Sequence, residues 1–300
     1  MSTRPAELNV LGRASRADVI TDPFPHVVIR NALREDVYEQ LANEFPGMSV
    51  IADDAAPQDN KYYFLSAAKA QTHQGVSALW KEFMAYHTSP AFLSEVVALF
   101  GNHIRAMHPH LELAFGKRLE EFTACARDTD GENDVDAQME CQFATCTTAL
   151  RRATPKGPHV DREHALYAGL LYFRLDGDDS TGGDLEIQRF KGVPRFEAGT
   201  NNEIPVDRVE TVKTVRYEKN TLVFFIHSAH SLHAVSARSA TPYPRRHVNF
   251  VTEFAHTKAF DIAPFRAGAA NAAASQGGIH RGVSAARRLL GRARRRLQPS

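Results

Sequence analysis

The stretch "KGPHVDREHALYAGLLYFRLDGDDSTGGDLEI" (residues 156–187) joins a polar turn to strand-like sequence. His159 and Asp161 stand two positions apart, shortly before the run "ALYAGLLYFRL" (165–175). In an extended chain, residues two apart point to the same face. The spacing therefore predicts an imidazole and a carboxylate held side by side at the edge of a sheet. Such a pair also arises as an ordinary turn that caps local backbone, so a third partner has to come from elsewhere.

The second half of the chain is typical of β structure. Seven runs of β-branched and aromatic residues follow residue 138, each bounded by turn residues. They are "CQFATCTTAL" (141–150), "ALYAGLLYFRL" (165–175), "DLEIQRF" (184–190), "VETVKTVRY" (209–217), "NTLVFFIH" (220–227), "LHAVSAR" (232–238) and "RRHVNFVTEF" (245–254). No helical periodicity separates them, so we expect an antiparallel barrel or sandwich.

The first half predicts helices behind that sheet. Leu33, Val37, Leu41 and Phe45 recur at helical spacing after a short strand at residues 27–29. Further helices are expected over residues 76–86 and from Pro90, because proline suits the first turn of a helix. The fold class predicted is α+β. We expect an extension (1–20), one domain (21–255, with helical support in 21–137 and a β core in 138–255), and a linker with a basic tail (256–300).

Charge is distributed unevenly along the chain. Residues 279–300 hold seven arginines and no acid, although the formal net charge of the whole chain is only +1. This balance does not indicate a specific nucleic-acid binder, and three cysteines without CxxC spacing are typical of a reduced, cytoplasmic protein. Residues 284–297 match a basic amphipathic helix, which predicts peripheral contact with the inner membrane face. The alternative is a solvated tail.

A third partner for His159 and Asp161 is sought in "NTLVFFIHSAHSLHAVSAR" (220–238), which holds three histidines. His230 stands in a turn and His227 ends a strand, whereas His233 opens the next strand, where sheet pairing would fix its direction. We select His233. Two histidines and one carboxylate on one face of a metal leave positions open, which suits Fe(II), whereas a structural zinc takes four protein ligands.

An arginine follows in "RRHVNFVTEF". Alternation places Arg246 on the same face as Val248 and Phe250, while Arg245 and His247 share the other face, which has the pattern of a solvent-facing side. We therefore expect Arg246 to point inward. A buried guanidinium without a partner is unfavourable, so a carboxylate ligand is its natural counterpart.

Taken in order, HxD at 159–161, "LLYFR" (170–174), "GGDLEI" (182–187), "SLHAV" (231–235) and the inward arginine resemble the Fe(II)- and 2-oxoglutarate-dependent oxygenases. The prolyl 4-hydroxylase-like branch of bacterial type is the most similar, over about residues 138–255, and "DPFPHVVI" (22–29) also looks like its members. The chain departs from the usual pattern in its extra histidines and in the thirteen positions from His233 to Arg246.

The resemblance implies a double-stranded β-helix (jelly-roll or cupin-like) with His159, Asp161 and His233 as iron ligands. It implies that Arg246 binds the distal carboxylate of 2-oxoglutarate and that the Tyr172 hydroxyl assists it. A core tyrosine is the alternative for Tyr172. Fe(II), 2-oxoglutarate and O₂ are the expected cofactors, with ascorbate as a further candidate.

The activity implied is a dioxygenase that hydroxylates an unactivated C–H bond while 2-oxoglutarate is decarboxylated to succinate. One alternative is a non-catalytic β-helix that binds a ligand or partner and is recruited to membranes by its tail. Another is a metal-dependent isomerase or hydrolase. The branch favours a peptidyl proline or an amino acid as substrate, and the basic tail favours a glycan or lipid-linked group. The sequence does not indicate the oligomeric state.

Overall fold

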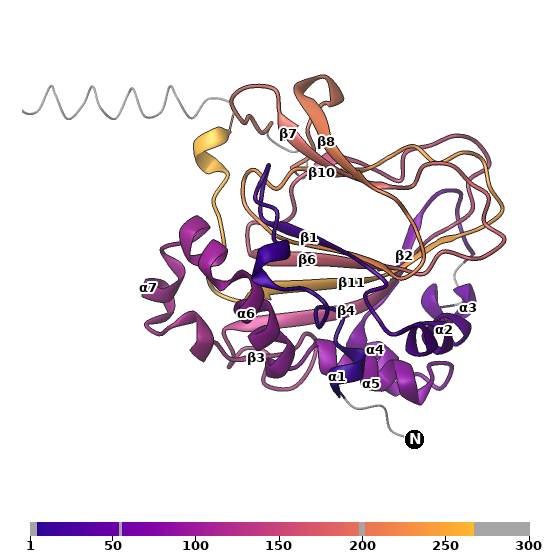
Figure 1. Ribbon diagram of the computed structural model, residues 1–300, viewed down its shortest axis with the longest axis horizontal. Helices are drawn as coiled ribbons and strands as arrows, with labels where there is room; N and C mark the ends of the chain where they lie inside the picture. Colours follow the sequence, from indigo (N-terminus) through magenta and orange to yellow (C-terminus); the bar gives the residue numbers. More distant parts are fainter. Residues whose placement is uncertain (1–4, 54–55, 198–201, 267–300) are drawn as a thin grey trace, which may run out of the picture.

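The computed structural model describes residues 5–53, 56–197 and 202–266 (Figure 1). The helices come early in the chain: α1 (Pro5–Leu8), α2 (Glu35–Asn43), α3 (Met48–Ile51), α4 (Ala67–Thr72), α5 (Ala78–His87), α6 (Pro90–Met107) and α7 (Leu111–Phe115). The strands are β1 (His26–Arg30), β2 (Tyr62–Leu65), β3 (Ala124–Ala126), β4 (Ala137–Cys146), β5 (Lys156–His159), β6 (Ala165–Tyr172), β7 (Leu185–Phe190), β8 (Val209–Val215), β9 (Thr221–Ile226), β10 (His233–Val235) and β11 (Arg245–Phe254).

The strands form two sheets that face each other (Figure 1). The major sheet has the order β1-β9-β6-β11-β4-β2, and β3 pairs in parallel with β4. The minor sheet has the order β5-β10-β7-β8, and all its pairings are antiparallel. The chain alternates between the sheets from β4 to β7 and again from β8 to β11, so most neighbours in each sheet are distant in sequence. The consecutive pairs β7–β8 and β3–β4 are the exceptions within the described residues. This alternation is the double-stranded β-helix arrangement, here as two separate sheets rather than a closed barrel within the described residues.

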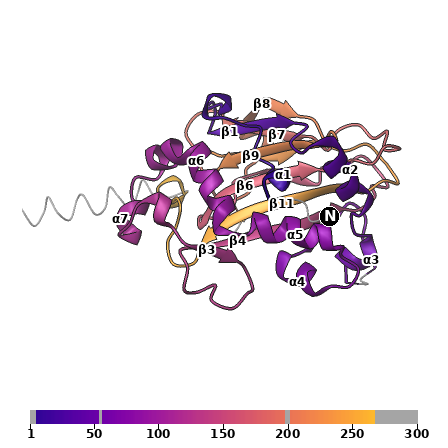
Figure 2. The same ribbon diagram turned by 60° about the horizontal axis from the view of Figure 1, so that its bottom comes forward.

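A helical layer covers the outer face of the major sheet, and Figure 2 brings it forward. Ser77 and Ser89 cap α5 and α6 by accepting hydrogen bonds from backbone N–H groups of the first turn, and Pro90 opens α6. The buried side chains of α6 recur at helical spacing. Phe92 of α6 packs against Phe224 of β9 and Phe250 of β11. The apolar face of β11 is therefore buried against helices and not against the second sheet.

Two apolar clusters follow from this layering. The larger one lies between the helices and the major sheet and includes Trp80, whose ring contacts Phe143 of β4. The smaller one lies between the sheets. Its members are Phe24, Ala168, Tyr172, Leu185, Ile187, Val215, Tyr217, Val223 and Phe225. The space between the sheets is thus mostly apolar, so a polar side chain that points into it is a candidate functional group.

The α+β fold class and the double-stranded β-helix are confirmed. All seven β runs contain strands, and the helices at 76–86 and from Pro90 correspond to α5 and α6. The short strand expected at residues 27–29 is β1, which joins the major sheet. The expectation of helices first and strands later did not include β2 and β3, which also join that sheet. Residues 267–300, with the predicted tail, lie outside the described residues. Across the described ranges, no helix is both long and apolar enough to span a membrane.

Candidate metal centre

Three side chains named from the sequence converge where β5 and β10 pair. His159 ends β5 and stands opposite His233, which begins β10, while Asp161 follows two residues after His159. One potential ligand atom from each residue lies within 4.8 Å of the other two. Nε2 of His159 is 3.6 Å from Oδ1 of Asp161, and Nε2 of His233 is 3.7 Å from Oδ2. The expected convergence of these three residues is therefore present, and the site is built on paired strands.

The two imidazoles are oriented by their other ring nitrogens. Nδ1 of His159 is 2.8 Å from the Gly157 carbonyl oxygen, and Nδ1 of His233 is 3.0 Å from the Ser231 carbonyl oxygen. Because a carbonyl oxygen only accepts hydrogen bonds, each Nδ1 must carry the proton. Both Nε2 atoms are then left with lone pairs directed at the shared centre, as metal coordination requires.

The electrostatics of the cluster favour a metal-binding charge state. Burial, with a smaller contribution from His233, lowers the pKa of His159 to about 4. Burial alone would raise the pKa of Asp161, but the imidazoles of His227, His233 and His159 outweigh it and lower that pKa to about 2. At neutral pH His159 is therefore neutral and Asp161 is ionised, so both can act as ligands without first losing a proton.

The other histidines of this region differ in their surroundings. His230 is exposed in the turn before β10, as the sequence predicts. His227 follows β9, is 0% exposed, and has Nε2 3.2 Å from Oδ2 of Asp161. His227 does not belong to the group of three mutually close ligand atoms. This agrees with the prediction, which selected His233 and not His227 as a ligand.

The inward orientation expected for Arg246 is wrong. Its side chain lies on the helix-facing side of β11, with the guanidinium 4.8 Å from the Phe45 ring centre and Nε donating to the Phe173 carbonyl. The residues alternate along β11 as expected, but the apolar face with Arg246 and Phe250 packs against the helical side and not against the second sheet. Helices cover that face, whereas the polar face looks toward the second sheet and is buried at Arg245 and His247 and half-buried further along the strand.

Arg245 occupies the inner position instead. The residue is 0% exposed, and Nε donates to the Gly183 carbonyl. Nη1 donates to the Tyr62 hydroxyl at 2.9 Å and lies 3.2 Å from Nδ1 of His247. Nη2 is buried and has no hydrogen-bond partner. Within the described part of the chain, no carboxylate lies within ion-pair distance of this guanidinium, so its charge is held only by neutral groups.

Tyr172 lies beside Arg245. It is 0% exposed, and its hydroxyl has no hydrogen-bond partner. It belongs to the cluster between the sheets, as the shared face of Ala168, Leu170 and Tyr172 predicts. Two buried polar atoms without partners, Nη2 of Arg245 and the hydroxyl of Tyr172, therefore occur in the same small region.

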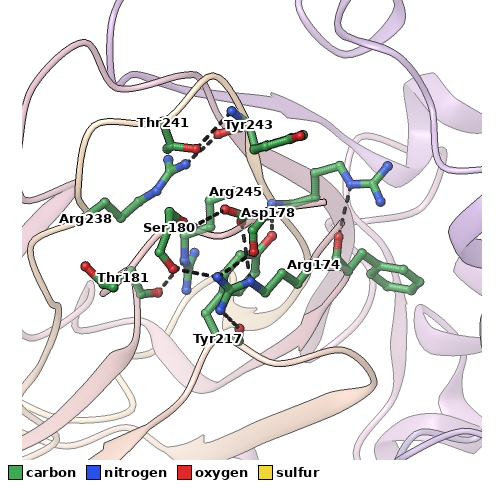
Figure 3. Close-up of polar contacts among 12 residues, drawn as sticks. Arg174, Asp178, Ser180, Thr181, Tyr217, Arg238, Thr241, Tyr243 and Arg245 are labelled. Atoms are coloured by element: carbon green, nitrogen blue, oxygen red, sulfur yellow. Dashed lines mark hydrogen bonds and ion pairs between the residues drawn. The ribbon is translucent and has the colours of Figure 1, made fainter. Parts of the chain in front are cut away.

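Two further arginines near this region have structural roles (Figure 3). Arg238 donates from Nη1 to the Thr147 carbonyl and from Nη2 to the Tyr243 carbonyl. Arg174 donates to the carbonyls of Asp178, Ser180 and Tyr217. Both terminal nitrogens of each guanidinium are thus bound to backbone and fix loops, whereas one of those of Arg245 is not. The sequence did not separate these arginines by role. The polar face of β11 could have indicated the role of Arg245. A ten-residue strand in a two-sheet fold has a neighbouring layer on both faces, so polar residues on its second face can point into the space between the sheets.

Comparison with known proteins gives similarity to solved structures only. No family model and no curated protein matches the chain. A prolyl-4-hydroxylase from Pseudomonas putida is 13% identical with a TM-score of 0.42, over 83% of this chain and 98% of that one. A prolyl 4-hydroxylase from Phytophthora capsici is 14% identical with a TM-score of 0.45, over 85% and 68%. The epimerase SnoN, solved with Fe³⁺, alpha-ketoglutarate and nogalamycin RO, is 13% identical with a TM-score of 0.43, over 84% and 85%.

The first two structures belong to the group that the sequence resembles. At these identities and TM-scores, the likeness concerns the path of the chain and carries no argument about chemistry. The chemistry has to be inferred from the site itself.

Proposed function

We propose that this chain is an Fe(II)- and 2-oxoglutarate-dependent dioxygenase that hydroxylates an unactivated C–H bond. One observation carries the proposal. The space between the sheets holds the group of His159, Asp161 and His233 together with two buried donors that have no partner, on Arg245 and Tyr172. The first feature suits a metal with open positions, and the second suits an anionic ligand beside it.

The donor set fits Fe(II). Two imidazoles and one carboxylate are the ligands of non-haem iron sites that leave positions open for a co-substrate and O₂. A structural zinc site would need a fourth protein ligand, and the group of mutually close ligand atoms has three members in the described residues.

The surroundings of Arg245 fit a carboxylate. Taking a guanidinium out of water without a counter-charge is strongly unfavourable, and a carboxylate can meet it with two parallel hydrogen bonds. Nη2 of Arg245 and the Tyr172 hydroxyl would hold the distal carboxylate of 2-oxoglutarate, whose other end would lie at the metal. Bound together, iron and 2-oxoglutarate supply oxidation by O₂, with decarboxylation to succinate.

The apolar cluster between the sheets separates the two ends of this site. The Phe225 ring lies 4.9 Å from that of His233, and Phe225 belongs to the same cluster as Tyr172, Leu185 and Ile187. These side chains exclude water around the proposed co-substrate. A dry environment strengthens the pairing of its carboxylate with Arg245 and suppresses side reactions.

For the substrate, we propose a peptidyl proline or an amino acid, with a glycan or lipid-linked group as the second class. Succinate release measured against a panel of peptides, amino acids and nucleotide sugars would separate these classes. Membrane recruitment by the basic tail remains a prediction, and deletion of residues 279–300 should abolish co-sedimentation with anionic vesicles if it is correct.

The central test is anaerobic addition of Fe(II) and then 2-oxoglutarate. We expect a weak visible charge-transfer band, followed by O₂ consumption and succinate release when air is admitted. Asp161→Ala should lose both, whereas His230→Ala, which changes an exposed histidine of the neighbouring turn, should keep both. Absence of the band and of succinate from the unaltered chain would refute the proposal. Binding of both ligands without O₂ consumption under any substrate would favour the non-catalytic alternative.

A further inference from the structure

A fourth histidine, His227, contacts the proposed ligand Asp161. It directly follows β9 in the major sheet, whereas Asp161 follows β5 in the minor sheet. Its Nε2 is 3.2 Å from Oδ2 of Asp161, which is shorter than the separation of either proposed histidine ligand from that carboxylate. His227 therefore links the two sheets at the metal centre.

The backbone of His227 is fixed on both sides. Its N–H donates to the Leu166 carbonyl at 2.9 Å, and its carbonyl oxygen is 2.8 Å from Nε2 of His108, a buried histidine just after α6. Its ring stands edge-on to Phe225, with ring centres 5.2 Å apart. Since the residue is 0% exposed, the ring has little freedom to move away from Asp161.

A fourth ligand role is disfavoured by the geometry. Two atoms bound to one metal at about 2.1 Å are at most about 4.2 Å apart. His227 does not join the group whose ligand atoms all lie within 4.8 Å of one another, so it would have to move toward the other histidines to bind. It touches the carboxylate from outside the triad.

We infer that His227 is a positioning residue that holds one oxygen of Asp161, so that the other oxygen is presented to the metal. The inference rests on the metal centre in the proposed function. A carboxylate with two free oxygens can rotate or bind through both of them, and a hydrogen bond from an outer imidazole removes that freedom. The 3.2 Å contact is not yet aligned as a hydrogen bond, and such contacts commonly tighten when a site is filled.

The test uses Co(II) as a probe of the full-length, metal-free chain, without 2-oxoglutarate or O₂. Titration followed by visible absorption gives both affinity and coordination. His227→Phe keeps the size of the ring but removes the donor, and it should weaken Co(II) binding by about 10- to 100-fold. His227→Gln restores a donor and should recover most of that loss. His230→Phe serves as the matched control and should bind as the unaltered chain does.

Unfolding midpoints and Co(II) spectra separate a positioning role of His227 from a purely structural role and from a ligand role. Unfolding midpoints of the metal-free variants identify any that fail to fold, and His227→Gln, which keeps a polar donor, then decides. Unchanged affinity in a folded His227→Phe variant would overturn the inference. A changed Co(II) spectrum in His227→Gln, indicating loss of an imidazole, would also overturn it and make His227 a ligand. Because no oxygenase step is involved, a chain that binds Co(II) but releases no succinate would contradict the proposed function alone.

Discussion

The guanidinium carbon of Arg245 lies 5.0 Å from the centre of the Tyr172 ring and 5.0 Å from that of the Tyr217 ring. A fully buried positive charge is thus held between two aromatic faces and has no carboxylate partner within the described residues. Cation–π contacts contribute about 2 kcal/mol when desolvated, which is less than the several kcal/mol lost when an ion leaves water. An anionic ligand would supply the missing stabilisation.

The pair Arg245 and Arg246 offers a matched test of this assignment. Arg245→Lys keeps the charge but loses the planar donor set, so we expect the Kd for 2-oxoglutarate to rise at least about tenfold. Arg246→Lys changes the neighbouring residue on the helix-facing side and should leave that Kd within about twofold. The measurement is anaerobic titration of the charge-transfer band, with unfolding of the ligand-free chain as a check on stability. The reverse order of effects would restore Arg246 as the carboxylate ligand.

Tyr172→Phe should separate affinity from stability. The hydroxyl is buried and without a partner, so its removal should leave the free energy of unfolding unchanged or raise it by up to about 1 kcal/mol. The same change should weaken 2-oxoglutarate binding by about three- to tenfold, because one hydrogen bond to the carboxylate is lost.

Tyr38→Phe provides the control for that variant, since the Tyr38 hydroxyl donates to the Tyr172 carbonyl at 3.1 Å. It should cost about 1 kcal/mol of stability with no change in affinity. Denaturant unfolding and ligand titration of both variants check the pair. If Tyr172→Phe destabilises the chain and leaves the Kd unchanged, its hydroxyl is a structural group.

Much of the fold could be predicted from the sequence, because local signals such as helix caps and strand patterns agree with the tertiary structure. The serine caps and Pro90 mark α5 and α6, and runs of β-branched, aromatic and other apolar residues between turn residues mark the long strands. By contrast, β2 has only four residues, and β5 contains a glycine and a proline, so neither carries a strand pattern of its own. Pairing with neighbouring strands defines them.

The site was predictable to the same extent. Spacing and strand position were sufficient for His159, Asp161 and His233, because sheet pairing fixes where such side chains point. They were not sufficient for the arginine. Alternation tells which residues share a face, but only the helical layer reveals that Phe250 and Arg246 look away from the second sheet. Which layer packs against each face of a strand depends on the whole fold and not on the strand's own sequence.

The glycine turn before β7 predicts a large and specific loss of stability. Gly182 has φ +76°, and a Cβ there would lie 2.0 Å from the Ala237 carbonyl oxygen. Gly182→Ala should therefore destabilise the chain by more than about 2 kcal/mol, since strain at positive φ adds to a backbone clash. Gly131→Ala has a similar φ of +85° but open space around the Cβ, and it should cost about 1 kcal/mol.

The same turn also supports the anion site, because the next residue, Gly183, accepts the hydrogen bond from Nε of Arg245. Gly182→Ala should thus weaken 2-oxoglutarate binding as well, whereas Gly131→Ala should not. Urea unfolding of both variants gives the stabilities. Equal losses from the two substitutions would show that the turn is able to move away from Ala237.

The stability of the protein should depend on pH because of His87, which is buried in the core among aromatic side chains. Its ring packs against Phe83, Phe92 and Phe250, and burial lowers its pKa to about 3. In the unfolded chain its pKa is about 6.5. Between these values the unfolded state binds a proton that the folded state does not, so stability is complete above about pH 6.5 and falls as the pH decreases.

His87→Phe should remove this contribution. Relative to the unaltered chain, the variant should gain about 2 kcal/mol between pH 7 and pH 5, at about 1.4 kcal/mol per pH unit below 6.5. Free energies of unfolding from urea titrations at the two pH values test this, and His256→Phe, at an exposed position, should show no such gain. Because other buried histidines also oppose acid, only the difference between variant and parent isolates His87. A difference that does not change with pH would mean that His87 takes up a proton without leaving the core.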